Sequence, residues 1–464
     1  MKPVAKNFFS LLTADIVRRL LGFASVAYLA RVLGTEWFGA VSIAFAVLSY
    51  GIIVNSLGLT TLGAREIAGG RSSDIVSDIL SLRLVMALGI VGVTAILAFL
   101  FIRDATTASL IVIFSISIFA YAMLLEWYFQ GKENMGIMGI GRVSSPALYL
   151  LLLVLFVKSP NEVLWVGVAA VAGDFLFAFV LLGKFRKDGG RIQFRVRLDT
   201  WKSMIKQSLP VGTGLLLAQF TVNYPPVALA LLKSNTDVGI FSAASKLVFY
   251  LLMVDRVLTP LLLPALTRWQ GISVEILSRR AGDVLRLLMI AGMPVAVGGT
   301  LLASPLVAFV FGPEYAAAAD VFRVFVWYFF LTIMSSVYGT ALWALGQNKA
   351  YGSAMLAGAC ALLVSVTLLT ALYGFMGTAF GIVISEGITL AILQKQLKKY
   401  GAVSMPQSVW KIFAASGFMA VAVLLMSQFH FLAVIFLGAL VYGILVLVFR
   451  IVTKEEISEL LRKA

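Results

Sequence analysis

The first long apolar run of the chain reads FFSLLTADIVRRLLGFASVAYLARVL, from Phe8 to Leu33, and its first half carries Asp15, Arg18 and Arg19. The apolar stretch after these charges is too short to cross a bilayer alone, because a spanning helix needs about 20 residues. The charges therefore lie within the span, where each costs about 2.5–3.5 kcal/mol on insertion scales. This stretch predicts a helix that lines a hydrophilic space inside a membrane protein.

The three charges of this span do not cancel. Asp15 and Arg19 are four residues apart, so they can form an ion pair on one face of the helix. Arg18 then keeps a positive charge, which must face protein or water. The two arginines have either a structural role, as ion-pair partners of Asp15, or a functional role. We favour the functional role because we expect one carboxylate to satisfy only one of them. A cavity that is cationic overall predicts an anionic cargo, and arginine and lysine suit phosphate.

The composition indicates a polytopic membrane protein. Of the 464 residues, 61% are hydrophobic and 13% are charged, whereas about 25% are charged in soluble domains. The net charge of +15 would permit nucleic-acid binding, but the basic residues concentrate in the loops of one side, which the positive-inside rule assigns to the cytoplasm. We expect no nucleic-acid partner, no metal site and no cofactor, and the run from Phe8 is too long for a cleavable signal.

Fourteen apolar spans fit the chain, which predicts an all-α protein of the inner (plasma) membrane with both termini in the cytoplasm. Residues 1–182 would form an N-terminal lobe of six spans, 183–206 a basic cytoplasmic linker, and 207–399 a C-terminal lobe of six spans. Residues 400–464 would hold two further spans and a cytoplasmic tail, in which Thr453 begins a short surface helix.

Three local features of the spans are also predicted. Residues 31–38 predict a short outer turn between the first two spans, and the third span would begin at Leu84, after a cytoplasmic loop. The seventh span contains Asn223, Pro225 and Pro226. Tandem prolines remove two helix donors and predict a break, whose free carbonyls only a cavity or neighbouring helices can satisfy.

An internal repeat relates the two predicted lobes. Seven residues recur at an offset of 200 positions: Thr13, Leu29, Ala30, Gly39, Ser42, Ala44 and Tyr50 match Thr213, Leu229, Ala230, Gly239, Ser242, Ala244 and Tyr250. Six spans separate the copies, so both lobes have the same orientation in the membrane. A parallel repeat around a central cavity is typical of transporters whose site lies between the repeats.

Five further charged residues lie within predicted spans: Asp174, Lys246, Asp255, Arg256 and Glu386. Lys246 either faces the cavity or extends to the membrane surface. Asp255 and Arg256 either line the cavity or pair with each other. Asp174 and Glu386 lie near mid-depth, so we expect them to pair with the arginines or to bind a coupling ion.

The chain shows no pattern typical of an enzyme. The glycines of residues 136–141 do not form a nucleotide loop, because no strand precedes them. The predicted outer loops are all short, which disfavours polymerases and ligases that carry a folded external domain. A membrane-embedded glycosyltransferase or polymerase, and a scaffold without transport activity, stay open as alternatives.

The start of the chain resembles a known family. The residues concerned are Asn7, YLARVLG from Tyr28 to Gly34, Phe38 with Gly39, Leu57–Leu59, and GAREIA from Gly63 to Ala68. Together they are similar to the polysaccharide flippases, the O-antigen and lipid-linked oligosaccharide branch of the superfamily that also contains lipid II flippases and multidrug and toxin extruders.

This resemblance implies two six-helix lobes around a V-shaped cavity, which moves a polyprenyl-diphosphate-linked oligosaccharide to the outer leaflet by alternating access. It also implies basic residues that hold the diphosphate, which here are Arg18, Arg19, Arg65, Lys246 and Arg256. The implied partners are this glycan lipid and membrane lipid, with glycan polymerase or assembly proteins left open, and we expect a monomer. A multidrug or lipid II exporter is the alternative, although an exporter of cationic drugs would need an acidic pocket.

Overall fold

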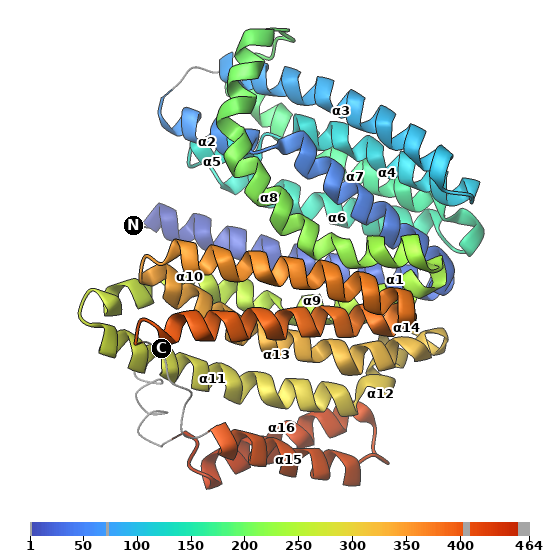
Figure 1. Cartoon of the computed structure of the whole chain (residues 1–464). Helices are drawn as coiled ribbons and strands as arrows, with labels where there is room; N and C mark the ends of the chain where they lie inside the picture. The colour runs from blue at the N-terminus through green and yellow to red at the C-terminus, as the bar shows by residue number, and fades with distance from the viewer. Residues whose placement is uncertain (1, 71–73, 402–408, 453–464) are drawn as a thin grey trace. The chain divides into compact units, whose positions relative to one another are not determined.

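The computed structural model describes residues 2–70, 74–401 and 409–452, and in this part of the chain all regular elements are helices, without strands (Figure 1). The surface helix predicted from Thr453 lies outside the described residues. Contacts between residues divide the chain into two compact units, Met1–Gly239 and Ile240–Ala464.

The first unit is built around α1. Its helices are α1 (Lys2–Ser56), α2 (Leu59–Ala68), α3 (Asp74–Phe101), α4 (Ala105–Met123), α5 (Glu126–Gly131), α6 (Gly136–Phe156), α7 (Leu164–Lys187) and α8 (Leu198–Leu232), with a 3-10 turn η1 (Pro160–Glu162). Helix α1 packs against α4, α6 and α8, and α7 packs against α4 and α6. The α8 helix, predicted to open the C-terminal lobe, contacts α1, α2 and α3 of this unit.

The second unit is built around α13. After α9 (Asn235–Leu251), which begins in the first unit, come α10 (Met253–Gln270), α11 (Val274–Leu301), α12 (Ala303–Phe311), the 3-10 turn η2 (Pro313–Tyr315), α13 (Ala316–Ala344), α14 (Asn348–Lys398), α15 (Val409–Leu425) and α16 (Phe431–Val448). Helix α13 packs against α10, α11 and α14, and α15 packs against both α11 and α16.

The described helices account for the predicted number of spans. Ten of them are long and apolar enough to cross a membrane, and the bent α8 makes eleven. Helices α1 and α14, with 55 and 51 residues, are each about twice as long as a bilayer crossing requires. Each is divided by a glycine with positive φ, Gly34 at 70° and Gly374 at 58°. Dividing both and adding the 17-residue α15 gives fourteen spans, and the prediction of an all-α multi-pass membrane protein is confirmed.

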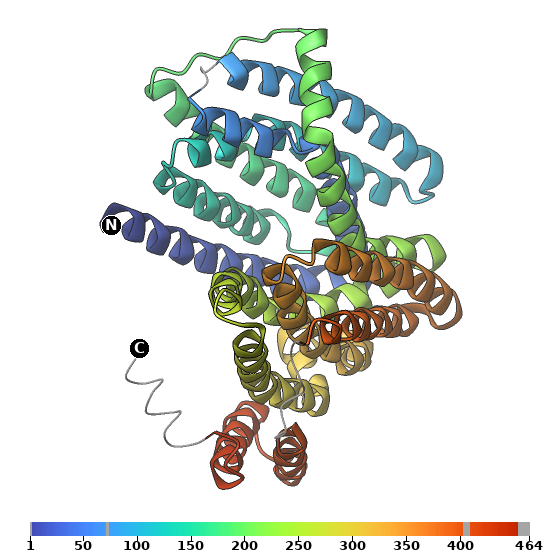
Figure 2. The ribbon, with the colours of Figure 1, turned by 60° about the vertical axis from the view of Figure 1, so that its left-hand side comes forward.

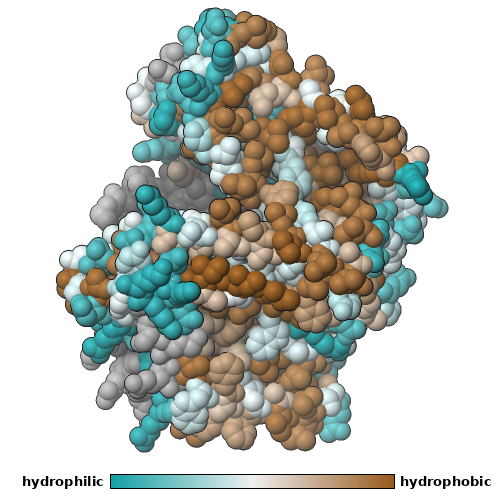
Figure 3. Space-filling view, viewed as in Figure 1, coloured by the Kyte–Doolittle hydropathy of each residue, from teal (hydrophilic) through white to brown (hydrophobic). Residues whose placement is uncertain are grey.

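The surface agrees with this assignment. Figure 3 shows apolar residues over the middle of the helices and hydrophilic residues gathered toward their ends. On α3, for example, Leu88, Ile96, Leu100 and Phe101 are each more than 65% exposed. Such an exposed apolar face is expected where lipid, rather than water, surrounds a helix.

One of the predicted boundaries is confirmed and one was wrong. The turn predicted at residues 31–38 corresponds to the kink at Gly34, whose non-helical backbone divides α1 into two helices. Helix α3 begins ten residues before Leu84, and Ile75–Arg83 are all buried. They pack into a core that also contains Leu59, Trp127, Phe185 and Trp201. Tertiary packing, which hydropathy along the chain does not detect, extends the helix beyond its lipid-facing part.

Helix α8 is not broken at its tandem prolines, and its bend lies before them. The segments Leu198–Leu217 and Gln219–Leu232 meet at 47°, about two helical turns before Pro225. The helix continues through Pro225 and Pro226. Beside the bend, Asn223 Nδ2 donates to the Gln219 carbonyl at 3.2 Å. The predicted break is therefore a bend, and side-chain donors satisfy part of the backbone around it.

Candidate functional site

The three charges of α1 lie together and form one ion-paired group. The Asp15 carboxylate accepts from Arg18 Nη2 at 2.9 Å and Nε at 3.2 Å, and from Arg19 Nε at 2.6 Å. The expectation that Asp15 satisfies only one arginine was wrong, because its two oxygens serve the positions three and four residues later. The group keeps a net charge of +1. The Arg18 side chain is 47% exposed and that of Arg19 is 21% exposed, so Arg18 is the accessible one.

A second polar group of the first unit lies between α4 and α7. The Asp174 carboxylate of α7 lies against the hydroxyls of Ser117 and Tyr121 on α4. Tyr149 of α6 is close to the same carboxylate. Tyr121 is also within electrostatic reach of Arg18. Asp174 and Arg18, from distant parts of the chain, therefore both influence the same tyrosine electrostatically.

The second unit holds a related arrangement. The Glu386 carboxylate of α14 lies against the Ser335 hydroxyl of α13 and near Asp255 of α10. Tyr328 of α13 and Tyr351 of α14 are near both carboxylates. Asp255 and Glu386 are thus brought together, which sequence spacing did not predict.

These two groups occupy equivalent places in the repeat. In each unit the carboxylate belongs to the sixth span of its half, at Asp174 or Glu386. It faces a hydroxyl group of the fourth span, at Tyr121 in one half and at Ser335 in the other. The repeat seen in the sequence therefore extends to the placement of intramembrane carboxylates.

The remaining predicted basic residues are differently placed. Lys246 lies half-buried on α9, and its ammonium makes no hydrogen bond or ion pair with the side chains that the structure describes. Arg65 lies on the short α2, outside the candidate spans, and its exposed guanidinium pairs with Glu66 at 3.1 Å. Arg256 belongs to α10, but its side chain is outside the described residues, so its pairing with Asp255 stays a prediction.

Sequence reasoning missed Arg83, which is 3% exposed. Its Nε donates to Asn55 Oδ1 at 3.2 Å and its Nη2 to the Tyr121 carbonyl at 2.7 Å, while Asn55 Nδ2 donates to the Arg83 carbonyl at 2.7 Å. The guanidinium caps the carboxyl end of α4, where positive charge is favourable. Asn55, a polar residue near the end of an apolar span, was the available signal that a buried partner exists.

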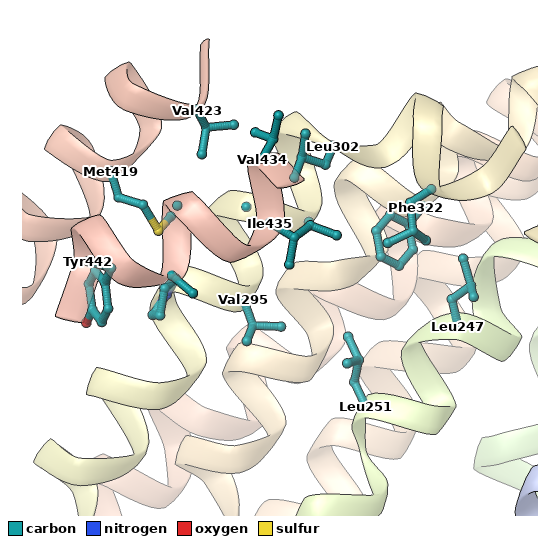
Figure 4. Close-up of a pocket in the computed structure, with 16 residues that line it drawn as sticks. Leu247, Leu251, Val295, Leu302, Phe322, Met419, Val423, Val434, Ile435 and Tyr442 are labelled. Carbon is teal, nitrogen blue, oxygen red and sulfur yellow. The ribbon is translucent and has the colours of Figure 1, made fainter. Parts of the chain in front are cut away.

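The second unit also contains an apolar cavity of about 370 Å³, between α9, α11 and the two last spans. Leu247, Phe322, Met419, Ile435 and Tyr442 line it (Figure 4). The Tyr442 hydroxyl donates to the Ile290 carbonyl at 2.9 Å. No charged residue lines this cavity, so it suits a hydrocarbon group and not a phosphate. Among the described residues, no three His, Cys, Asp or Glu side chains come together as metal ligands.

Solved structures share this fold. A lipid II flippase in an inward closed conformation superposes with a TM-score of 0.79 and 15% sequence identity, covering 95% of this chain and 98% of that chain. An inward-facing multidrug resistance MATE family transporter of the MOP superfamily superposes with a TM-score of 0.66 and 16% identity, covering 83% of this chain and 94% of that chain. These identities support a common fold and nothing finer.

Similar sequences span nearly the whole chain. A protein of Shigella dysenteriae named "Putative O-antigen transporter" is 23% identical over 85% of this chain and all of its own length. The stage V sporulation protein B of Bacillus subtilis is 22% identical over 98% of this chain and 97% of its own. The model of one family, described as polysaccharide biosynthesis protein, matches residues 4–270. Because this match covers more than half of the chain, the chain belongs to the polysaccharide biosynthesis protein family.

Proposed function

We propose that this protein is a flippase that moves a polyprenyl-diphosphate-linked oligosaccharide from the cytoplasmic to the outer leaflet of the inner membrane, for cell-surface polysaccharide biosynthesis. Its family and its similarity to a transporter of O-antigen support this class of cargo. The observation that carries the proposal is the group formed by Asp15, Arg18 and Arg19, which keeps a net positive charge within a membrane span. Such a charge is costly in lipid and is used for anionic substrates.

In this proposal the arginines bind the diphosphate. Asp15 orients the two guanidinium groups, and Arg18, the more exposed of them, presents its remaining donors to the phosphate oxygens. Planar guanidinium groups match phosphate geometry well. Lys246, Arg65 and Arg256 would add positive charge along the path of the cargo.

Transport would proceed by alternating access between the two six-span lobes predicted at residues 1–182 and 207–399. Asp174 and Glu386 are the candidates for binding a coupling ion, since each carboxylate lies against hydroxyl oxygens inside its unit. The load and the ion would shift the population between inward-open and outward-open states. No bond is made or broken, so the protein would not be an enzyme.

The topology follows the same proposal. Both termini would lie in the cytoplasm, because the basic residues of the segment between α7 and α8 mark that side. The protein would act as a monomer, with glycan polymerase or assembly proteins as partners on either side of the membrane.

A translocation assay tests this function. Purified protein in liposomes receives a polyprenyl-diphosphate-linked oligosaccharide, and a glycosidase that cannot cross the membrane reports how much glycan changes leaflet. We expect translocation by the wild type, loss in Arg18→Ala, and full activity in Lys158→Ala, which removes an exposed charge from an outer turn. Wild-type protein that translocates no such glycan would contradict the proposal.

The same liposomes separate the alternatives. The shared fold with a lipid II flippase favours lipid II as the second candidate cargo. Transport of lipid II but not of oligosaccharide lipid would identify that exporter, and transport of organic cations alone would identify a drug exporter. A glycosyltransferase or polymerase would lengthen the glycan, and a scaffold would tolerate Arg18→Ala together with Lys246→Ala in cells.

A further inference from the structure

The segment between α7 and α8 is bound along one of its sides to α3. The Gln193 backbone N–H donates to Ser77 Oγ at 3.1 Å, and the Arg195 backbone N–H donates to Ser81 Oγ at 2.9 Å. The Arg195 guanidinium bonds Asp74 at 3.0 Å. Residues 191–197, called the strap here, are non-helical and run along the first turns of α3 (Figure 2).

The other side of the strap is apolar and uncovered. In an extended chain successive side chains point to opposite sides. Because the Arg195 guanidinium is directed to Asp74 of α3, the side chains of its two neighbours, Phe194 and Val196, point away from α3. Phe194, Val196 and Leu198, the first residue of α8, are 64%, 60% and 72% exposed. Large apolar side chains that share one uncovered side mark an interaction surface.

Unpaired basic side chains flank this apolar side. Arg195 and Arg197 are directed inward, toward Asp74 and Asp78, and Lys184 pairs with Asp188. Four other basic residues are exposed and make no ion pair with the described residues: Arg186, Lys187, Arg191 and Lys202. The surface around the strap is therefore both apolar and cationic.

The strap lies at the depth where a lipid headgroup region is expected. The part of α3 beneath it, Ile75–Arg83, is buried by protein. The exposed apolar residues of the same helix begin directly afterwards, at Val85 and Leu88. Apolar side chains flanked by Lys and Arg at the edge of the hydrocarbon are typical of segments that bind anionic membrane surfaces.

We propose that the strap anchors the protein to anionic phospholipids of the leaflet on its side of the membrane. Phe194, Val196 and Leu198 enter the upper part of the acyl chains, and the four basic side chains contact phosphate groups. The partner is a bilayer lipid and not the cargo, so this inference does not depend on the proposed function. Lipid bound here would hold the start of α8 against the membrane surface.

Spin labelling tests the depth of the strap. In a Cys360→Ser background, which removes the one native cysteine, a label at Val196→Cys is compared with a label at Lys132→Cys, an exposed loop position. In bilayers with phosphatidylglycerol, oxygen should relax the Val196 label more strongly than a water-soluble nickel chelate does, and the reverse should hold at Lys132. Equal accessibility of both labels to the chelate would overturn the anchor.

Lipid retention tests the charge requirement. Protein is purified from mixed phosphatidylglycerol and phosphatidylcholine, and the retained lipids are counted for two triple variants. The first triple variant, Arg186→Gln with Lys187→Gln and Arg191→Gln, should lower the ratio of retained phosphatidylglycerol to phosphatidylcholine at least tenfold. Each basic group near an anionic surface contributes roughly fivefold to the affinity. The control Lys395→Gln, Lys398→Gln and Lys399→Gln removes the same charge from exposed residues of the α14 end, and should change the ratio less than twofold. Equal losses in both, or no loss in the first, would overturn the proposal.

Discussion

At the scale of single residues, the buried charges of the first unit are held by polar partners from other helices. Arg83 joins Asn55 of α1 to the last turn of α4, and this turn contains Tyr121, which faces Asp174. Since a buried guanidinium without partners is costly, this network fixes the position of α4 as well as the position of the arginine. The positions of the side chains near the proposed site therefore depend on Arg83 and Asn55, which lie outside that site.

Replacing Asn55 with leucine should destabilise the protein. The Arg83 Nε would lose its acceptor inside the protein, and the Arg83 carbonyl would lose the donor it has beside its helical partner. A buried polar group left unsatisfied costs about 1–3 kcal/mol, so the apparent Tm in detergent should fall by several degrees. Asn134→Leu, at an exposed position, is the control. An Asn55→Leu variant that melts like the control would show that the network does not contribute to stability.

At the scale of elements, the ends of the helices show how capping residues in the sequence determine where a helix begins. Asp104 caps α4, where its carboxylate accepts from the backbone N–H of Thr107 at 2.8 Å and of Thr106 at 3.4 Å. The Thr107 hydroxyl also donates to it. These donors, the hydroxyl first, hold the pKa of Asp104 below its ordinary value. An aspartate at this position is a strong sequence signal for a helix start.

The cap gives a pH-dependent prediction. Asp104→Ala should cost about 1 kcal/mol at neutral pH. Because the folded state lowers the pKa of Asp104, its contribution is complete above the ordinary value near 4 and is lost as the pH falls through the folded value. The difference in the free energy of unfolding between wild type and Asp104→Ala should therefore be larger at pH 7 than at pH 3. A difference that grows on acidification would contradict this assignment.

The crossing of α1 and the start of α9 depends on a repeated glycine. A Cβ at Gly39 would lie 1.8 Å from the Asn235 carbonyl oxygen, and one at Gly239 would lie 1.8 Å from the Thr35 carbonyl oxygen. Gly39→Ala and Gly239→Ala should each force the two helices apart and lower the apparent Tm. Gly89→Ala, on α3 with no atom within 4 Å, should be neutral or stabilising. A Gly39→Ala variant as stable as Gly89→Ala would argue against this close contact.

At the scale of the whole molecule, hydropathy and the repeat were sufficient to predict fourteen spans in two related halves, because lipid imposes a length and a composition on each crossing. They could not show that Asp174 meets Tyr121, or that Glu386 meets Ser335, since these contacts join helices far apart in the chain. Arg83 was assigned to a loop for the same reason: its position before an apolar run resembles a flank, and only packing with Asn55 makes it buried.

Cysteine accessibility tests the topology of the whole chain. In the Cys360→Ser background, a cysteine at Arg186 should react with a membrane-impermeant maleimide only after the cells are opened, because the proposed topology places the basic segment in the cytoplasm. A cysteine at Lys158 should react in intact cells. Both positions are exposed, so differences in reactivity report the side of the membrane. Reaction of the Arg186 position in intact cells would reverse the assigned orientation.

In the proposed mechanism, the positive charge of the first span receives the phosphorylated end of the cargo. This is tested by the affinity of the purified protein for a polyprenyl diphosphate, compared with the corresponding monophosphate, in wild type and in Arg18→Ala with Arg19→Ala. Hydrogen bonds to charged groups contribute about 1.5–3 kcal/mol each, and about 1.4 kcal/mol is a factor of ten. We predict that the double variant loses at least tenfold in affinity for the diphosphate and no longer prefers it over the monophosphate. A double variant that binds the diphosphate as tightly as the wild type would show that these two arginines do not receive the cargo.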